Sequence, residues 1–437
     1  MIIKRTLISR LFAAVAVLGL VASPLTGQSV TIDVTKVQQR YPWNGLVDID
    51  YTIMRSEGEG AYDPDLYCVE FTVVNHGVTP AVTNVAKEFR NGNPTVSDGG
   101  HRVTWDANAD GVDFASESVE VVAEIVHYER TYMVIDLSGG PSATVYPVTY
   151  LSEPPAGGFN IEKYKGDKIV LRMVQPGSFL MGSPTTEPGR SDTADREVQH
   201  AVSITKPFYI GIFQVTQKQY KNVMANADPS KFKGPYRPVE QVSYNTVRGS
   251  AQWPQADSVG ASSFIGVLRA KCKEWDSDKR AYAKDIGGVF DLPTEARWEY
   301  ACRAGTTTPF NNGVSCANDE DLDIQLGKLG CYNYDQSYGE GFQHAIVGSY
   351  ESNAWGLYDM HGNVWEFCLD WYRADVQNID NPSVDPVGPA TGTLRVRRGG
   401  SWLDGVSRNC RSAMRNSIDP NNAGGSNVGF RLSMSLP

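Results

Sequence analysis

The sequence predicts an α+β protein in which a small all-β domain precedes a larger domain of irregular structure. Three observations support this prediction. Apolar and polar residues alternate through the N-terminal part, two later segments carry helix-capping residues, and the region after Gly305 is rich in Gly, Asn and Asp. A chain of 437 residues is long enough for two or three domains, each with its own core.

The N-terminal part, residues 29–137, predicts a small β-sandwich. Val30, Ile32 and Val34 alternate with polar residues, and the apolar residues of 67–73 follow the same period of two. This period is typical of half-buried strands. Because the segments between these runs hold turn residues such as Asn91-Gly92, we expect several short strands arranged as a sandwich.

Residues 138–160 contain two stretches rich in Gly and Pro, 139–141 and 154–158, and this composition predicts a linker. The second domain, 161–437, then begins with a predicted strand at 169–174. Thr216 and Thr294 each stand before a segment with helical spacing of apolar residues. We therefore expect each threonine to cap the first turn of a helix.

Residues 1–28 have the composition of a secretory signal peptide. Lys4, Arg5 and Arg10 accompany a short apolar run, 11–22, which Ser23-Pro24 ends. A membrane span needs about 20 apolar residues, and this run is shorter. We therefore expect a secreted or periplasmic protein with no membrane span. The net charge of −10 argues against a nucleic-acid partner.

The seven cysteines are candidates for disulfides, because an exported protein folds in an oxidising compartment. Cys316 and Cys331 bracket one loop, so they are candidates for a disulfide. No Cys-x-x-Cys and no His-x-x-x-His occurs in the chain, which argues against a zinc ribbon and a helix-borne metal pair.

Two motifs near the C-terminus are the most specific features of the sequence. Residues 398–402 read Arg-Gly-Gly-Ser-Trp, and residues 356–367 read Gly-Leu-Tyr-Asp-Met-His-Gly-Asn-Val-Trp-Glu-Phe. With further markers in the same order, they resemble the formylglycine-generating, or sulfatase-modifying factor, family over about 165–435. The resemblance implies an irregular α+β fold that is related to C-type lectins.

The same resemblance implies where catalytic residues should stand. Active members of the family use two cysteines shortly after the Gly-Gly-Ser, which bind copper and activate oxygen. The matching positions fall near Asp404 and Ser407. A carboxylate and a hydroxyl are poor Cu(I) ligands, so we do not expect copper. Ser401 and Trp365 match residues that line the active-site groove in the family.

The resemblance also implies a disulfide and calcium sites. The pair Cys302–Cys410 would join the helix at Thr294 to the C-terminal segment. Calcium is the expected ion, because the matched ligands are carboxylates and carbonyls, which calcium prefers. The alternative for Asp359 and Glu366 is turn capping or pairing with arginines. The two matched ligand sets are Asp359, Gly362, Val364 and Glu366, and Asn333, Tyr334, Glu340 and Phe342.

Four arginines of the terminal motif have two interpretations. They are candidates for recognising an acidic ligand, and equally for bracing loops through carbonyl and carboxylate groups. These are Arg398, Arg411, Arg415 and Arg431.

Two functions follow from these observations. The first is an exported, calcium-stabilised module that binds a glycan, peptide or protein, or has a structural role. The alternative is an oxidase that converts a sulfatase cysteine to formylglycine. Replacement of the cysteine pair by Asp404 and Ser407 favours the module, and leaves open whether the protein is an enzyme.

Overall fold

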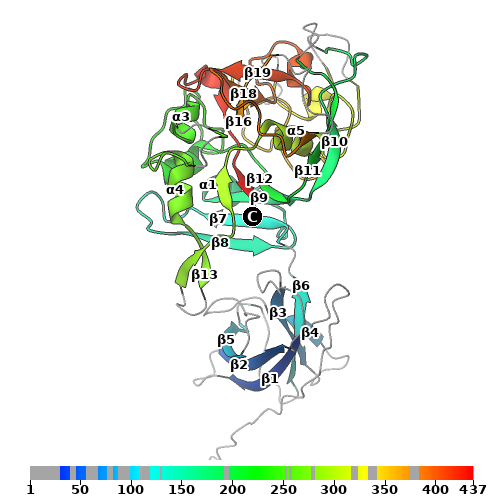
Figure 1. Ribbon diagram of the computed structural model, residues 1–437. Helices are drawn as coiled ribbons and strands as arrows, with labels where there is room; N and C mark the ends of the chain where they lie inside the picture. The colour runs from blue at the N-terminus through cyan, green and yellow to red at the C-terminus, as the bar shows by residue number, and fades with distance from the viewer. Residues whose placement is uncertain are drawn as a thin grey trace, which may run out of the picture. The chain divides into compact units, whose positions relative to one another are not determined.

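The computed structural model divides into two compact units, Met1–Arg130 with Trp275–Ala281, and Thr131–Glu274 with Tyr282–Pro437 (Figure 1). It describes residues 30–39, 46–55, 67–75, 82–86, 99–108, 110, 119–127, 130–190, 196–250, 253–254, 258–276, 281–315, 323–332, 342–374 and 383–436. The predicted signal peptide, 1–28, lies outside these residues.

The described part of the smaller unit consists of strands. One antiparallel sheet has the order β1-β2-β5, from strands Val30–Gln39, Leu46–Arg55 and Gly99–Asp106. The other has the order β4-β3-β6, from Val82–Val85, Tyr67–Asn75 and Val119–His127. Inward apolar side chains from both sheets, including Ile49 and Phe71, form one buried cluster. A complete sandwich over 29–137 stays a prediction, because several connecting segments lie outside the described residues.

The larger unit is built on an eight-stranded sheet of order β14-β13-β8-β7-β9-β12-β21-β15. Its strands are Ala281–Asp285, Cys272–Asp276, Tyr146–Leu151, Tyr132–Asp136, Lys168–Val174, Phe208–Gly211, Ser433–Ser435 and Val289–Asp291, in that order. Strand β9 covers the strand predicted at 169–174.

The boundary between the units differs from the prediction. Strand β7 lies before the predicted boundary at 137, and β8 lies within the predicted linker, yet both belong to the larger sheet. Ile135 pairs with Val148, so the Gly-rich stretch 139–141 is part of a short connection within the sheet. Gly and Pro indicate a turn here, and composition alone does not distinguish a turn from a linker.

Short helices cover the sheet and carry the predicted caps. Thr216 begins α2 with a reciprocal capping box, since its side chain accepts from Gln219 N while the Gln219 side chain accepts from Thr216 N. Thr294 accepts from Arg297 N and begins α5. Both caps are confirmed. The helices are α1 Glu162–Gly166, α2 Gln217–Val223, α3 Tyr244–Val247, α4 Phe264–Lys271 and α5 Glu295–Arg303.

Two smaller sheets position the C-terminal motifs. The four-stranded sheet has the order β19-β18-β16-β20, from Arg415–Ile418, Arg395–Arg398, Trp365–Trp371 and Val428–Gly429. The other consists of β10 Gly177–Met181, β11 His200–Ile204 and β17 Ser383–Val384. Every residue of β16 is buried. In Figure 1, β16, β18 and β19 lie at the opposite end of the larger unit from β7 and β8.

Much of the larger unit outside these elements is irregular, as predicted. Three short 3-10 turns, Leu326–Lys328, Ser407–Cys410 and Gly425–Asn427, interrupt the loops. The fold is therefore a mixture of helix and sheet with mostly strands and few, short helices.

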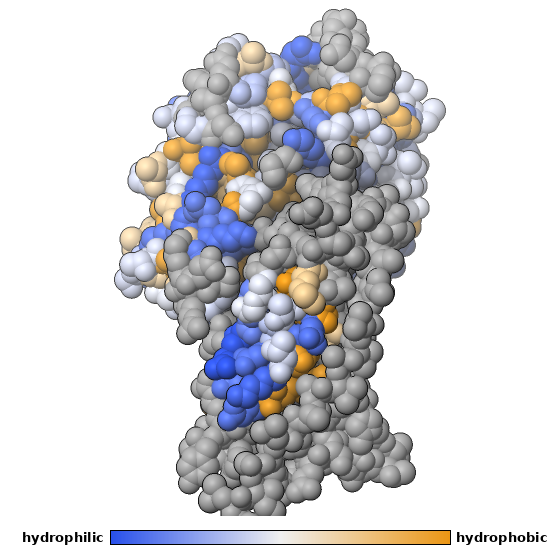
Figure 2. All heavy atoms as spheres, turned by 60° about the horizontal axis from the view of Figure 1, so that its bottom comes forward, coloured by the Kyte–Doolittle hydropathy of each residue, from blue (hydrophilic) through white to orange (hydrophobic). Residues whose placement is uncertain are grey.

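The surface of the larger unit carries scattered apolar side chains. Figure 2 shows hydrophobic and hydrophilic residues interspersed on the visible face of this unit. Among the described residues, no helix is both long and apolar enough to cross a bilayer.

Candidate functional site

The loop 401–410 follows β18 and folds back on itself. Gly399 and Gly400 both have positive φ, 96° and 75°, a conformation that glycine adopts without strain. A Cβ added at Gly400 would stand 2.5 Å from the Cys410 Sγ. The end of the loop therefore packs directly beneath its beginning, and only glycine fits at this contact.

Asp404 is held in this loop by side-chain hydrogen bonds. Ser401 Oγ donates to Asp404 Oδ2 at 2.6 Å, and Asn409 Nδ2 donates to Asp404 Oδ1 at 3.1 Å. Trp365 also lies close enough to this carboxylate to lower its pKa. Burial raises the pKa of Asp404 above its ordinary value, against the hydrogen bond from Ser401 and the charge of Arg397. The structure thus brings together three predicted residues, Ser401, Trp365 and Asp404.

Ser407 lies further along the same loop. It begins the 3-10 turn Ser407–Cys410 and is fully buried. Trp365 and Ser401 are also buried, with 1% and 0% of their surface exposed, so they form the floor beneath the loop. Leu403 is the exposed apolar residue of the loop, at 39%. Leu403 therefore lies on the solvent-facing side of this loop, while Ser401 and Asn409 hold the neighbouring Asp404 carboxylate.

The predicted Cys302–Cys410 disulfide is not formed, because Cys302 is a thiol. Its Sγ lies 3.6 Å from Ser412 Oγ, two residues beyond Cys410 on the terminal segment. Cys410 instead belongs to a separate buried cluster with Phe310, Leu326, Leu329 and Tyr332. Cys410 is only two positions away from the residue that faces Cys302. The register of the segment places Ser412 there instead.

His361 lies between the two cysteines and is neutral. Its Nδ1 donates to the carbonyl oxygen of Cys410 at 2.7 Å, and its Nε2 accepts from Asn311 N at 3.1 Å. Burial lowers the pKa of His361 to about 4 and raises the pKa of Cys302 to about 12. A thiol with such a pKa is not a nucleophile at neutral pH, so this group is structural.

The four residues of the first predicted calcium set lie around one point, which is occupied by the side-chain amide nitrogen of Gln214. The Gln214 Nε2 is 3.3 Å from the carbonyl oxygen of Asp359 and 3.5 Å from that of Gly362. It donates to Val364 O at 3.0 Å and to Glu366 Oε1 at 2.9 Å. We call these four oxygens the oxygen cage.

Turns of unusual backbone conformation form the cage. Asp359 has φ 57° and Asn363 has φ 64°, and Gly362 has φ 100°. A Cβ added at Gly362 would stand 2.3 Å from Cys331 O, so glycine is required there. The Asp359 carbonyl faces the cage, while its side chain bonds elsewhere, because Asp359 Oδ2 accepts from Gly348 N at 2.7 Å.

The acidic residues of the set have different partners. Glu366 is fully buried and accepts from Arg431 Nη2 at 2.8 Å and from Trp298 Nε1 at 2.7 Å, so the predicted alternative of pairing with an arginine is observed. Asp359 Oδ1 is buried without a hydrogen-bond partner among the described residues. Burial raises the pKa of Asp359 to about 6. With Gln214 in this position, the donor set does not fit a calcium ion.

Three of the four residues of the second predicted calcium set lie outside the described residues, namely Asn333, Tyr334 and Glu340. Phe342 is described and is 61% exposed. The predicted Cys316–Cys331 disulfide is not formed, because Cys331 is a thiol, and Cys316 itself lies outside the described residues. Among the residues that the structure does describe, no group of three or more His, Cys, Asp or Glu is placed to hold a metal ion.

Comparison with known proteins decides the family. Residues 162–436 match the family model described as the sulfatase-modifying factor enzyme 1-like domain. The chain belongs to this family.

Several relatives carry names. The formylglycine-generating enzyme of Streptomyces coelicolor is 38% identical over 160 residues, which cover 36% of this chain and 49% of that protein. The enzyme of Mus musculus is 36% identical over 146 residues, 32% of this chain and 38% of its own. Chaperone protein LppX of Paenibacillus barcinonensis is 30% identical over 257 residues, 55% of this chain and 80% of its own. The match thus spans half or less of the length of the two formylglycine-generating enzymes.

Two solved structures are similar to part of this chain. PvdO from Pseudomonas aeruginosa has a TM-score of 0.47 and 26% identity, covering 61% of this chain and 94% of that chain. Treponema denticola variable protein 1 has a TM-score of 0.44 and 27% identity, covering 62% of this chain and 96% of that chain.

In this sulfatase-modifying factor domain, the four motif arginines brace the fold. Arg398 pairs with Glu299 and Glu295, and Arg411 pairs with Glu187 and Glu197. Arg415 forms a bidentate pair with Glu295, and Arg431 one with Glu366. All four arginines are buried and paired with glutamates, so the bracing interpretation is confirmed.

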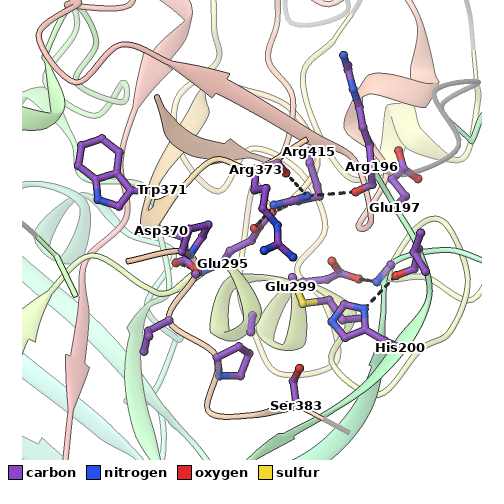
Figure 3. A pocket seen from close by; sticks show the side chains of 18 of the residues that line it. Arg196, Glu197, His200, Glu295, Glu299, Asp370, Trp371, Arg373, Ser383 and Arg415 are labelled. Atoms are coloured by element: carbon purple, nitrogen blue, oxygen red, sulfur yellow. Dashed lines mark hydrogen bonds and ion pairs between the residues drawn. The ribbon is translucent and has the colours of Figure 1, made fainter. Parts of the chain in front are cut away.

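A cavity of about 320 Å³ lies beside these pairs, between α5, β11 and the end of β16 (Figure 3). Figure 3 shows Arg415 between Glu295 and the main chains of Arg196 and Arg373. Asp370 lines the cavity and accepts from Glu295 N at 2.7 Å. Burial, with the charge of Glu295, raises the pKa of Asp370 to about 7.

Sequence reasoning missed two residues of the domain. Gln214 stands two positions before the predicted cap Thr216, and Asp370 stands three positions after the motif 356–367. Both flank markers that the sequence shows. Their roles depend on which side chains converge in three dimensions, and a single sequence carries no signal for that convergence.

Proposed function

We propose that this chain is an exported member of the sulfatase-modifying factor family that binds a glycan, peptide or protein ligand and lacks the copper- and cysteine-dependent oxidation. Export rests on the signal-like composition of residues 1–28, and the relation to C-type lectin folds belongs to the same proposal. Calcium at the second predicted set also stays a proposal.

One observation carries the non-catalytic interpretation. Where the family resemblance places the thiolates, Asp404 is tied to Ser401 and Asn409, and Ser407 is buried. Cys410 is the cysteine of the loop, and it is fully buried beneath Gly400. Binding of Cu(I) needs soft thiolate ligands, and this loop offers a carboxylate and a hydroxyl instead.

The binding surface that we propose is the solvent-facing side of loop 401–410. Leu403 supplies an exposed apolar contact, and Asp404 supplies an acceptor that its neighbours hold in one orientation. A few fixed polar groups next to apolar area are typical of ligand sites. Loops on a rigid scaffold commonly carry binding, and the buried arginine pairs make this scaffold rigid.

The formylglycine-generating oxidase remains the second candidate, because a relative of that name is 38% identical to this chain over 160 residues. Cu(I) titration together with turnover of a Cys-x-Pro-x-Arg peptide distinguishes the two. We expect neither Cu(I) binding nor aldehyde formation. Stoichiometric Cu(I) with aldehyde product contradicts the proposal. The double variant Asp404→Cys/Ser407→Cys is the matched control, and should bind Cu(I) if the loop keeps the family frame.

Binding itself is tested on glycan and peptide arrays. Ligands retained by the protein should be lost in Leu403→Asp and Asp404→Ala and kept in Lys221→Ala, a residue of α2 whose side chain pairs with Asp228. Equal binding by all three variants would place the ligand elsewhere.

A further inference from the structure

The oxygen cage contains an unusual excess of acceptors. Four oxygens surround the amide nitrogen of Gln214, which has two hydrogens to donate. Three of the four are main-chain carbonyls of the turn 359–364, and the fourth belongs to the Glu366 carboxylate. Such a set of hard oxygens around one buried point is typical of a cation site.

The orientation of the Gln214 amide follows from its neighbour. Ala345 N donates to Asn363 Oδ1 at 2.9 Å, so Asn363 must present its Nδ2 on the other side. This Nδ2 donates to Gln214 Oε1 at 2.9 Å. The Gln214 nitrogen, and not its oxygen, therefore points into the cage. The main-chain N–H of Ala345 fixes this assignment, because it can only donate. The oxygen and nitrogen of a side-chain amide, in contrast, can be exchanged by a flip.

The distances suit a nitrogen donor and not an ion. The cage oxygens stand 2.9–3.5 Å from Nε2. Calcium holds its oxygen ligands at about 2.3–2.6 Å, whereas an N–H donor stands about 2.7–3.2 Å from its acceptor. Val364 O and Glu366 Oε1 are within that second range. Arg431 and Trp298 provide the remaining compensation for the Glu366 charge.

We propose that the Gln214 side chain replaces a bound cation at the oxygen cage, so that this site holds the turn 359–364 without a metal ion. The inference does not depend on the proposed function, because it concerns how the frame is held and not what the loop 401–410 binds. It also predicts that removing the amide hydrogens creates a cation site, since the oxygens would then face each other without a donor.

The test compares thermal unfolding of the purified full chain in calcium and in a chelator. Wild type should keep its Tm. Gln214→Glu removes both amide hydrogens at constant size, and should bind one calcium ion and gain about 3 °C at a calcium concentration tenfold above its Kd. Gln214→Ala, which vacates the space, serves as a second variant if Gln214→Glu does not fold.

Matched controls identify the site. Gln217→Glu alters another buried glutamine, whose Nε2 donates to Phe232 O at 2.7 Å, and should show no calcium response. If calcium raises the wild-type Tm and Asp359→Asn removes the gain, the amide does not replace the ion. If neither Gln214 variant responds more than Gln217→Glu, the cage is not a latent cation site and the proposal is wrong. Isothermal titration with calcium chloride gives the stoichiometry.

Discussion

The loop 401–410 and the oxygen cage belong to the same domain and depart from the family's expected sites in different ways. The loop lacks the expected ligands, whereas the cage has oxygen ligands but no space for the ion. In the loop, the frame of Gly399 and Gly400 is present, but Asp404 and Ser407 stand where the family resemblance places thiolates. In the cage, the four predicted residues converge, Asp359 through its main-chain carbonyl and not its carboxylate, and an amide nitrogen occupies their centre. A motif can therefore keep the geometry of a site while losing either its ligands or the room for its ion.

The two regions share one kind of support. Arg411 follows the loop and binds Glu187 and Glu197, and Arg431 adjoins the cage and binds Glu366. Each arginine is fully buried with its carboxylates. Buried pairs of this kind fix the geometry of their surroundings, although replacing both partners by apolar residues need not lower stability.

The largest effects are expected from breaking these pairs. Arg431→Ala and Arg411→Ala should each lower the free energy of unfolding by about 3–5 kcal/mol, because each leaves a buried carboxylate without its partner. Urea unfolding measures the loss. Lys221→Ala, which breaks the more exposed pair with Asp228, should cost at most about 1 kcal/mol. If Arg411→Ala costs no more than this control, the loop is not braced as the cage is.

A smaller effect is expected at Asp370, at the end of the strand that carries Trp365 and Glu366. Burial and then the charge of Glu295 raise its pKa to about 7, above the unfolded value of about 3.9. Between about pH 3.9 and 7, the Asp370 carboxyl is therefore protonated in the folded state and ionised in the unfolded state. The stability from this group is fully present below about pH 3.9 and is lost as pH rises through about 7.

Asp370→Asn removes that titration and can still accept from Glu295 N. Relative to wild type, the variant should become more stable as pH rises from 4 to 7, by about 1.4 kcal/mol for each pKa unit of the shift. Unfolding in urea at several pH values measures the difference. A difference that does not vary with pH would show that Asp370 is ionised throughout.

The smallest effect is expected at the helix that follows Gln214. Thr216→Ala removes the capping box of α2 and should cost about 1 kcal/mol. Ser263→Ala, at the cap of α4, is the comparable change away from the cage. If Thr216→Ala also produces a calcium response like that expected of Gln214→Glu, the cap is needed to hold the amide in the cage.

The sequence predicts the α+β class, the caps Thr216 and Thr294 and the family, because these depend on local patterns and on ordered motifs. It places the unit boundary too late, since Gly139-Gly140-Pro141 forms a turn between paired strands. The Cys302–Cys410 pairing fails for a related reason. A shift of two residues directs Ser412 to Cys302, and no spacing rule reveals that register.

The candidate site was predicted in part. Ser401, Trp365 and Asp404 do lie together, because Ser401 and Asp404 are three positions apart and β16, which carries Trp365, pairs with β18. Gln214 and Asp370 were missed, since their roles arise only when segments distant in the chain converge. The amide of Gln214 reaches Glu366, which stands 152 positions later.

Anomalous X-ray diffraction from crystals soaked in calcium chloride and then in a Cu(I) salt tests most directly whether protein groups fill both centres. The expected map has no anomalous peak in the oxygen cage or in loop 401–410, with Gln214 Nε2 within hydrogen-bonding distance of Val364 O and Glu366. A calcium peak bound by Asp359 and Glu366, or a copper peak on Cys410, would contradict it.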